Sequence, residues 1–541
     1  MKKLLLFLLI SNFYFAQWSI STAERNALTQ LFSSTDGANW STVWDLEKDP
    51  KNWYGIKVKN GNVTEINLRG NALKGNFPNQ FSVFPKLEKL DLSNNQLSGE
   101  VGTSLSSVTN LTRLDLSNNR LEGDPSAILT SLINLKELSI GTNNFSIATI
   151  GTLITSFPNL SVLNIANLNL TSVPTQISSL TKLEILDLSS NPITNFSALQ
   201  NRTLLKELNL SSTSISVIPS QISSLVNLKT LDLSNNTLMG NYSSPLTSLH
   251  SLEWLSLENT GISTIPNEVL QLQKLIHLNL GRNKISGGLS SLVSLSDLQQ
   301  LFLNHNSLSG NFPSELLQLD RLQMLSLVSN NLTGNLPSNL PSLTFIDNNK
   351  FTQSNIASFL QLENKVADFT YSPQRYDTET TVGAPLGTST TLSQSLTGSD
   401  YTFSWYKNLD EKLNVNTENL YITDIENSDY GKYTAEAYFL KAYPKYVMEV
   451  SFWREPITLE NGLSTVELNK KLTVFPNPTS DYINIRTENL KFEKAFIYDL
   501  SGKMILETSS TKIDVRNLPS SVYIITLKTD QGEKTIKWIK K

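Results

Sequence analysis

The chain has 541 residues, a formal net charge of −4, 39% hydrophobic residues and no cysteine. Its length predicts several domains, and its composition is typical of folded, soluble protein rather than of a disordered chain. The absence of cysteine excludes disulfides, thiolate metal sites and thiol catalysis, and the small net charge gives no general attraction to nucleic acid or to anionic membranes.

Residues 1–16 are typical of an export signal peptide. Lys2 and Lys3 precede an apolar run from Leu4 to Ile10, which is too short to anchor a mature protein in a bilayer. We expect cleavage after Ala16. No cysteine follows to carry a lipid, and no later stretch is long and apolar enough for a transmembrane helix. The sequence therefore predicts an exported protein without a transmembrane span.

Residues 63–350 contain an internal repeat, for which we count 12 to 13 copies. In each copy the leucines are expected to point inward from a short strand, while the intervening residues face outward. One copy cannot bury its leucines alone, but stacked copies form a continuous apolar core. The frame L-x-x-L-x-L-x-x-N recurs every 21 to 25 residues, opening at Val63, Leu87, Leu111, Leu135, Leu160, Leu183, Leu205, Leu228, Leu252, Leu275, Leu298, Leu322 and, in a degenerate copy, Leu343.

The ninth position of the frame predicts how the chain turns away from each strand. An asparagine amide there can pair with backbone groups that would otherwise be buried without a partner. Thr213 and Thr260 offer a hydroxyl for part of this role, whereas Leu168 cannot, so we expect a local distortion in the fifth repeat. The asparagines at this position are Asn71, Asn95, Asn119, Asn143, Asn191, Asn236, Asn283, Asn306 and Asn330.

This frame is the leucine-rich-repeat signature, and the resemblance covers more than half of the chain. Copies such as Leu73–Pro78 resemble plant-type repeats, and copies such as Leu170–Pro174 resemble the shorter bacterial form. The resemblance implies a horseshoe-shaped solenoid with strands on its concave side. A solenoid of this kind needs a cap at each end to cover its terminal leucines.

Residues 17–62 resemble the amino-terminal cap of plant-type repeats, with a helix expected over Glu24–Phe32. That cap normally carries cysteines, which are absent here. We therefore expect the packing of Trp40 and Trp44 with the Asn52–Gly55 segment to replace the disulfide staple. At the other end, residues 351–378 are expected to form a carboxyl-terminal cap and a linker.

Residues 379–458 have short alternating apolar runs, which predict an antiparallel β-sandwich. Phe403–Tyr406 resembles strand C of an immunoglobulin-like domain, with Trp405 as its core tryptophan. Asp429–Tyr433 resembles the tyrosine corner of the same family. The family's disulfide is absent, and we expect Leu392, near one cysteine position, to pack on Trp405.

A linker is expected over residues 459–469, followed by a last domain over 470–541. Its motifs Val474–Asp481, Ile497–Met504 and Leu518–Tyr523 resemble, in order and spacing, the carboxyl-terminal sorting domain of type IX secretion. The resemblance implies a small all-β domain that engages the type IX machinery to cross the outer membrane. Ser521 stands where that family has glycine, and the turn tolerates serine if the backbone there is not left-handed.

Together these segments predict a mixed α/β leucine-rich-repeat solenoid followed by two small all-β domains, an immunoglobulin-like sandwich and a β-sandwich sorting domain. The outward residues of the repeat strands form the expected binding surface. Most are small or polar, but Trp254, His277 and Met324 occupy third positions, Phe302 a fifth and His305 an eighth. Neighbouring parallel strands lie about 4.8 Å apart, so we expect one ligand-binding patch. The alternative is that these side chains cover one another or lie under a loop.

Other chemistry has little support in the sequence. His277 and His305 lack a third metal ligand, and no Gly-rich phosphate loop or nucleophile elbow is present. We expect no catalytic residues, no metal and no cofactor. Four fifth-position aspartates recur in the same repeat motif without a calcium loop, which indicates repetition rather than a catalytic pair or calcium ladder: Asp91, Asp115, Asp187 and Asp232.

The sequence therefore predicts a secreted or cell-surface binding protein, either an adhesin or a surface receptor. Its expected partners are an extracellular protein or glycan and the type IX secretion machinery, with no role for nucleic acid. A structural component of a surface layer or biofilm matrix, without one defined ligand, stays open as an alternative. An enzyme-associated module is the third alternative.

Overall fold

The structure is a computed structural model that describes residues 19–146, 150–238, 243–362, 368–462, 472–488, 490–530 and 532–541. The expected signal peptide and most of the linker expected over 459–469 lie outside these residues. The chain divides into two compact units. Unit 1 comprises Met1–Ser309, Pro313–Asn330 and Asn339–Thr344, and unit 2 comprises Gly310–Phe312, Asn331–Ser338 and Phe345–Lys541.

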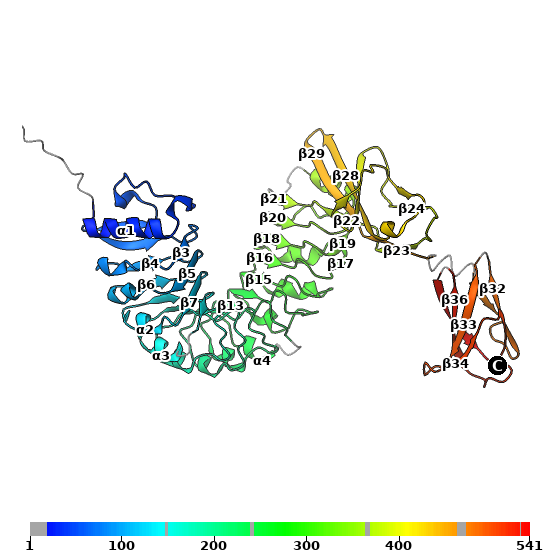
Figure 1. Ribbon diagram of the computed structural model, residues 1–541, viewed down its shortest axis with the longest axis horizontal. Coiled ribbons are helices and arrows are strands. Elements are labelled where there is room, and N and C mark those ends of the chain that lie inside the picture. Colours follow the sequence, from blue (N-terminus) through cyan, green and yellow to red (C-terminus); the bar gives the residue numbers. More distant parts are fainter. Residues whose placement is uncertain are drawn as a thin grey trace, which may run out of the picture. The chain divides into compact units, whose positions relative to one another are not determined.

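Unit 1 is built on one long sheet, in which β1 is antiparallel to β2 and every later neighbour is parallel. Figure 1 shows its strands on the inner side of the curve, with the short helices α2, α3 and α4 on the outer side. In order, the strands are β1 (Ile56–Lys59), β2 (Asn62–Asn67), β4 (Lys89–Asp91), β6 (Arg113–Asp115), β8 (Glu137–Ser139), β10 (Val162–Asn164), β11 (Ile185–Asp187), β12 (Glu207–Asn209), β13 (Thr230–Asp232), β14 (Trp254–Ser256), β15 (His277–Asn279), β16 (Gln300–Phe302) and β18 (Met324–Ser326).

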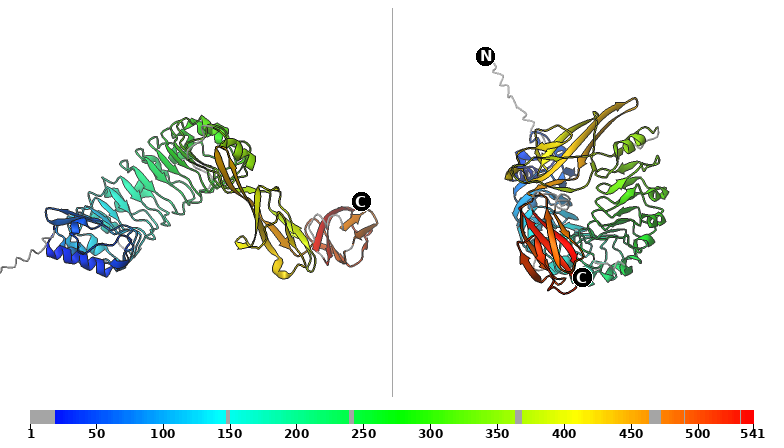
Figure 2. Two further views of the ribbon diagram at one scale, coloured as in Figure 1. Left: turned by 90° about the horizontal axis from the view of Figure 1, so that it is seen from above. Right: turned by 90° about the vertical axis from the view of Figure 1, so that its right-hand side faces the viewer.

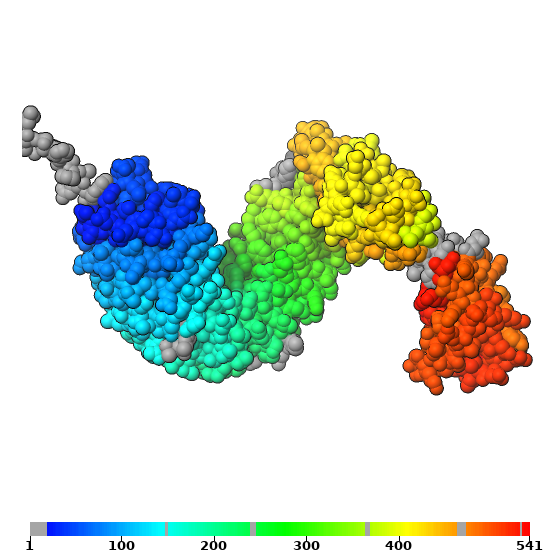
Figure 3. Space-filling model, viewed as in Figure 1, coloured from blue at the N-terminus to red at the C-terminus, as the bar shows by residue number. Residues whose placement is uncertain are grey.

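The outer side of unit 1 consists of short strands and single helical turns. Near its start the plant-type copies add a parallel sheet of β3 (Lys74–Asn76), β5 (Gln96–Glu100), β7 (Arg120–Gly123) and β9 (Asn144–Phe145). The turns are η3 (Phe81–Val83), η4 (Thr103–Ser107), α2 (Ser126–Leu129), α3 (Ile150–Thr155), η5 (Thr175–Ser179), η6 (Ser197–Leu199), η7 (Ser220–Ser224), α4 (Ser243–Leu246), η8 (Val269–Gln271), η9 (Leu289–Ser294) and η10 (Ser314–Gln318). Figure 3 shows the successive repeats as one unbroken surface from blue to green.

The repeat leucines and asparagines behave as predicted. Leu87, Leu90 and Leu92, at the first, fourth and sixth positions, are fully buried. Asn95 Nδ2 donates to the carbonyl of Leu68 and its Oδ1 accepts the backbone N–H of Leu73, so one amide joins two repeats. A repeat with this asparagine can therefore satisfy backbone groups of its predecessor.

The fifth repeat, which has Leu168 in place of asparagine, keeps its strand pairing. β10 and β11 continue in the common register, so the expected distortion does not reach the sheet. The turn of this repeat has a left-handed eighth residue, Asn167, as the other repeats do, and a left-handed tenth residue, Asn169, which it shares with the repeats of Ala72 and Ser214. Asn191 Oδ1 of the next repeat accepts the backbone N–H of Leu168 at 2.9 Å, which secures the turn from the following repeat.

The segment before the first repeat, which we refer to as the cap, contains α1 (Thr22–Ser34), η1 (Gly37–Asn39) and η2 (Pro50–Asn52). Phe32, Trp40, Trp44 and Trp53 form a continuous aromatic cluster, with Trp44 and Trp53 stacked at 4.8 Å between ring centroids. Each indole N–H donates to a backbone carbonyl. The predicted packing of Trp40 and Trp44 with the Asn52–Gly55 segment is therefore present, through the contact of Trp44 with Trp53.

The cap is also bonded to the first repeat through a buried carboxylate. Glu24, on α1, is 2% exposed, and its Oε1 accepts the backbone N–H of Val63 at 3.1 Å. A carboxylate that accepts a backbone amide forms a charge-assisted bond, which is stronger than a neutral one. The helix is thereby fixed to the edge of the solenoid at β2.

Unit 2 contains the end of the repeat array and a β-sandwich. The former includes β19 (Asn331–Thr333), α5 (Gln353–Leu360) and β21 (Asp368–Thr370), while β17 (Ser309–Asn311) and β20 (Leu343–Phe345) lie at the division between the units. The sandwich consists of β22 (Gln374–Tyr376), β23 (Thr380–Gly383), β24 (Thr390–Leu392), β25 (Tyr401–Lys407), β26 (Glu411–Lys412), β27 (Leu420–Ile422), η11 (Asn427–Asp429), β28 (Gly431–Tyr443), β29 (Tyr446–Arg454) and β30 (Ile457–Glu460).

The core of this sandwich surrounds Trp405, which is fully buried and shares one apolar cluster with Leu392 and Ala435. Its indole N–H donates to the carbonyl of Thr417 at 3.0 Å. The Tyr433 hydroxyl donates to the carbonyl of Asp429, four residues earlier. The predicted packing of Leu392 with Trp405 is therefore present in this core.

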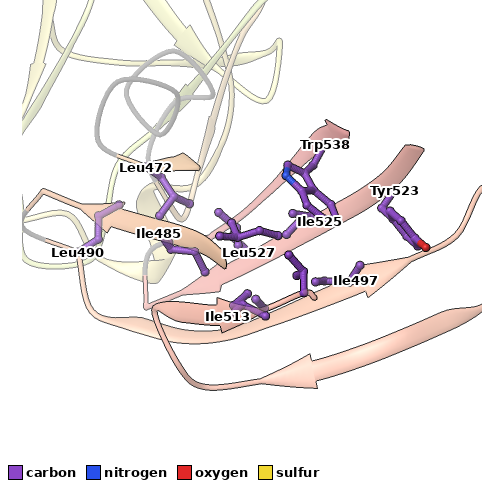
Figure 4. Packing of buried hydrophobic residues seen from close by; sticks show 12 residues of the cluster. Leu472, Ile485, Leu490, Ile497, Ile513, Tyr523, Ile525, Leu527 and Trp538 are labelled. Atoms are coloured by element: carbon purple, nitrogen blue, oxygen red, sulfur yellow. The ribbon is translucent and has the colours of Figure 1, made fainter. Parts of the chain in front are cut away.

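The last part of the chain forms a second β-sandwich, whose core is shown in Figure 4. Trp538 and Ile525 are fully buried, together with Leu472 and Ile497. Ser521 is not among the residues with positive φ, as its tolerance in that turn requires. One sheet contains β31 (Leu472–Phe475), β32 (Tyr482–Thr487) and β35 (Lys512–Asp514), and the other β34 (Met504–Thr508), β33 (Phe492–Tyr498), β36 (Val522–Thr529) and β37 (Gly532–Ile539).

Candidate binding site on the solenoid strands

The five predicted site residues lie on consecutive repeats of unit 1. The strand register aligns Trp254, His277, Gln300 and Met324 in one row across β14, β15, β16 and β18. Phe302 belongs to the neighbouring fifth-position row. Figure 2 shows how the strands of successive repeats stack side by side, so that each row crosses them.

Three of these residues are in direct contact. The rings of Trp254 and His277 are stacked, with centroids 4.9 Å apart and planes inclined by 19°. His277 also meets Phe302, with centroids 5.1 Å apart and planes inclined by 36°. All three side chains are half-buried. We call Trp254, His277 and Phe302 the aromatic patch. The rings partly cover one another and keep part of their surface open to solvent.

Gln300 fixes the central ring of the patch. Nδ1 of His277 lies 2.9 Å from Oε1 of Gln300. A carboxamide oxygen only accepts, so this contact assigns the proton to Nδ1 and leaves Nε2 as an acceptor. Burial lowers the pKa of His277, and the bond to Gln300 opposes this only in part. The imidazole is therefore neutral at physiological pH, and its Nε2 carries a lone pair that can accept a hydrogen bond.

The other two predicted residues lie at the border of the patch. Met324 is half-buried and is paired with Gln300 in the register of β16 and β18. His305 is exposed in the turn after β16, where its φ is 54°. Partial burial and the positive charge of Arg282 lower the pKa of His305, while Glu258 raises it.

Polar residues that the sequence analysis did not select complete this border. Arg282 Nε forms an ion pair with Glu258 Oε1 at 3.2 Å, and Glu258 Oε2 accepts from the Asn279 amide at 2.9 Å. Apart from His305 at an eighth position, the sequence analysis considered only the third and fifth positions, whereas Glu258 and Arg282 occupy the seventh and eighth. Gln300 was missed because a glutamine at a third position has no distinguishing signal in the sequence.

The side chains of the fifth-position row mainly stabilise the turns that follow the strands. In most repeats the fifth side chain accepts the backbone N–H two residues later, which holds the turn after the strand; Asp91, for example, binds the N–H of Ser93 at 3.1 Å. Phe302 belongs to this row, and its side chain has no acceptor for that bond. The same bond is made by Asn67, Asp115, Asn164, Asp187, Asn209, Asp232, Ser256 and Asn279.

Elsewhere the strand face is mostly polar and charged, apart from Val162 and Ile185, which lie side by side in the third-position row. Arg113 lies between Asp91 and Glu137, at 3.4 and 3.0 Å. Burial is the main cause that raises the pKa of Asp115, whose carboxylate also binds Ser117. Asp91 thus pairs with the next repeat, whereas Asp115 binds a serine of its own turn. Among the described residues, no group of three or more His, Cys, Asp or Glu is placed to hold a metal ion.

Family models match several segments of the chain. The model described as leucine rich repeat matches residues 86–108, 110–132, 227–249 and 321–343, and related repeat models match 158–201 and 250–308. The model described as secretion system C-terminal sorting domain matches residues 473–541. The chain therefore contains leucine-rich repeats and a sorting domain of type IX secretion, which directs the protein to the cell surface or beyond. No helix within the described residues is long and apolar enough to cross a membrane.

Solved structures with similar folds are also leucine-rich-repeat proteins. One from Leptospira interrogans is 30% identical, with a TM-score of 0.46 over 56% of this chain and 76% of that chain. A plant receptor kinase ectodomain from Arabidopsis thaliana is 24% identical, with a TM-score of 0.42 over 66% of this chain and 54% of its own length. An internalin from Listeria monocytogenes is 23% identical, with a TM-score of 0.40 over 58% and 92%. No curated protein matches the sequence.

Proposed function

We propose that this secreted leucine-rich-repeat protein is an adhesin or surface receptor that binds an extracellular protein or glycan at its aromatic patch. The observation that carries the proposal is the chain of ring contacts Trp254–His277–Phe302 on a mostly polar strand face. Aromatic side chains are enriched among the residues that dominate binding energy at interfaces. Met324 and His305 lie at the border of the same site.

Phe302 supports a binding role more directly than its neighbours do. At its position most repeats use a polar side chain to hold the following turn. A phenylalanine forgoes that bond, at a cost of about 1 kcal/mol. Residues that reduce local stability in this way are typical of functional sites.

His277 gives the patch one directional contact. With Nδ1–H bonded to Gln300, Nε2 is an acceptor held between two aromatic rings. A hydroxyl or amide donor on the ligand can meet it while apolar parts of the ligand cover Trp254 and Phe302. We therefore propose a ligand that combines an apolar face with a hydrogen-bond donor, and binding rather than catalysis.

We also propose the domain organisation. Residues 1–16 act as signal peptide and 17–62 as amino-terminal cap; the repeats span 63–350, with a carboxyl cap and linker at 351–378. Residues 379–458 form an immunoglobulin-like spacer, and 459–469 lead to the sorting domain at 470–541. Support for the spacer comes from the parallel pairing of β22 with β29 and the antiparallel order β29-β28-β25-β26. The buried Trp405 and the Tyr433–Asp429 bond add to it.

The test is ligand capture with matched variants of residues 17–541. The wild type and Trp254→Ala/Phe302→Ala are applied to a glycan array and to extracellular protein extracts, and binding to each captured ligand is then titrated. Ile133→Ala is the control, because Ile133 is an exposed apolar residue outside the patch, 57% accessible. Saturable binding that only the double variant loses supports the proposal. Self-association without a saturable ligand would favour a matrix component instead.

A further inference from the structure

The outward face of the sheet in unit 2 carries a second aromatic surface. Tyr406 on β25 and Trp453 on β29 meet across the intervening strand β28, with ring centroids 5.1 Å apart and planes inclined by 44°. Both are partly accessible, whereas the alternating neighbours Trp405 and Phe452 are buried. The two rings therefore span about two strand spacings, ~10 Å, on the solvent side.

Carboxylates and hydroxyls lie beside these rings on the same face. Glu436 Oε1 accepts from the Ser451 hydroxyl at 2.6 Å, and its Oε2 accepts from the Tyr406 hydroxyl at 3.3 Å. The Tyr438 hydroxyl donates to Glu449 Oε1 at 2.7 Å. The strand register places Glu436 opposite Trp453. Each carboxylate oxygen can accept a further bond, so the face presents acceptors of fixed position next to an aromatic surface.

The charges of this face select against an anionic ligand. Arg375, which is opposite Trp453 on β22, is ion-paired with Glu455 at 2.7 Å and donates to Asn331. Lys412 lies 5.9 Å from the centre of the Tyr406 ring at an exposed position, where a ligand can displace its flexible side chain. Glu436 and Glu449 have no basic partner among the bonds described above. A neutral ligand rich in hydroxyl donors fits this combination.

We propose that Tyr406, Trp453, Glu436 and Glu449 form a binding platform for a neutral oligosaccharide, in which sugar rings stack on the two aromatic rings. The hydroxyls of the sugar donate to the two carboxylates, and the aliphatic C–H face of the ring covers the indole and the phenol. This platform lies in unit 2 and is independent of the aromatic patch in unit 1. Figure 1 shows the strands β28 and β29 that carry most of it.

The experiment is native affinity electrophoresis of residues 17–541 in gels that contain a neutral β-glucan, xylan or galactomannan. We expect at least one of these polysaccharides to retard the protein. Trp453→Ala and Tyr406→Ala should each weaken the association at least tenfold. Glu436→Gln, which keeps the shape of the side chain, should weaken it to a smaller extent. An unchanged thermal midpoint shows that each variant remains folded.

Three control variants make the outcome specific. Tyr421, 66% accessible on β27, belongs to another sheet, so Tyr421→Ala should leave the retardation unchanged. Val447, 60% accessible on the same face, would contact a protein partner but not a short sugar, so Val447→Ser should have no effect. Trp254→Ala should also have none, which separates this platform from the solenoid patch. Absence of retardation, retardation by anionic polysaccharides alone, or full binding by both aromatic variants would overturn the proposal.

Discussion

The imidazole of His277 lies flat against the indole of Trp254, with ring centroids 4.9 Å apart and planes inclined by 19°. The imidazole in this contact is neutral at physiological pH, because burial lowers the pKa of His277 below its ordinary value of about 6.5. A group with a lower pKa in the folded state takes up protons more readily when the chain is unfolded. The neutral, buried imidazole of His277 therefore contributes to the stability of the fold above a pH of about 6.5, and this contribution is lost as the pH falls.

The first prediction concerns this pH dependence. Thermal unfolding of the wild type should shift to lower temperature between about pH 7 and pH 5 by more than that of His277→Gln, which cannot be protonated. His250→Gln is the comparison, because His250 is exposed and is not one of the patch residues. Parallel curves for wild type and His277→Gln would contradict the assignment.

The second prediction separates stability from binding at Phe302. Phe302→Asn restores the acceptor that most repeats have at this position, so the loss of ring contacts is offset by a new bond to the following turn. We expect the free energy of unfolding to stay within about 1 kcal/mol of the wild type, while ligand binding falls by about 2 kcal/mol. Phe302→Ala, which gains no such bond, should be less stable than Phe302→Asn in denaturant titration. Equal stability of the two variants would show that the fifth-position bond contributes nothing.

The third prediction tests the asparagine ladder. Asn236 is 3% exposed; its Nδ2 donates to the carbonyls of Leu210 and Leu233, and its Oδ1 accepts from Thr213 and Ile215. Asn236→Leu leaves these backbone groups buried without partners and should lower the free energy of unfolding by about 3 kcal/mol or more.

The matched control for the ladder is Asn227→Ala. Asn227 is exposed and donates one bond to the carbonyl of Thr203. Its removal should cost less than about 1 kcal/mol, because water replaces the lost partner. Similar losses for Asn236→Leu and Asn227→Ala in urea titration would argue against a bridge between repeats.

The fourth prediction concerns the aromatic cluster of the cap. Trp44 is 3% exposed and contacts Phe32, Trp40 and Trp53. Trp44→Ala should cost about 3–5 kcal/mol through the cavity that it leaves. It should also make the first helix more sensitive to limited proteolysis. The adjacent Val43 is 50% exposed, so Val43→Ala should change neither measurement. An intact, protease-resistant cap in Trp44→Ala would show that the cluster does not replace a staple.

The sequence predicted the core of the repeats and the packing of the segment before them. The buried leucines, the asparagine bonds and the cap tryptophans follow from residue type and spacing, and the structure places them as expected. Trp254, His277, Phe302 and Met324 lie on adjacent strands because a common register fixes which positions meet, and His305 lies in the turn after β16.

What the sequence did not predict depends on side-chain direction and on bonds within turns. The seventh and eighth positions, which bring Glu258 and Arg282 to the border of the patch, belong to turns whose left-handed residues have no fixed identity. The orientation of Tyr406 toward Trp453 joins segments 47 residues apart, and no periodic pattern links them. The strand-pairing register of β25, β28 and β29 is needed to bring them together.

The constant register of the solenoid makes each repeat an interchangeable unit. Because the same three positions align across every parallel pair from β2 to β18, a duplicated repeat between β12 and β13 would enter the sheet without changing any other pairing. Such an insertion would move the aromatic patch about 4.8 Å further from the cap and preserve its internal contacts. The reach of the binding surface can thus evolve by gene duplication, while its chemistry is inherited intact.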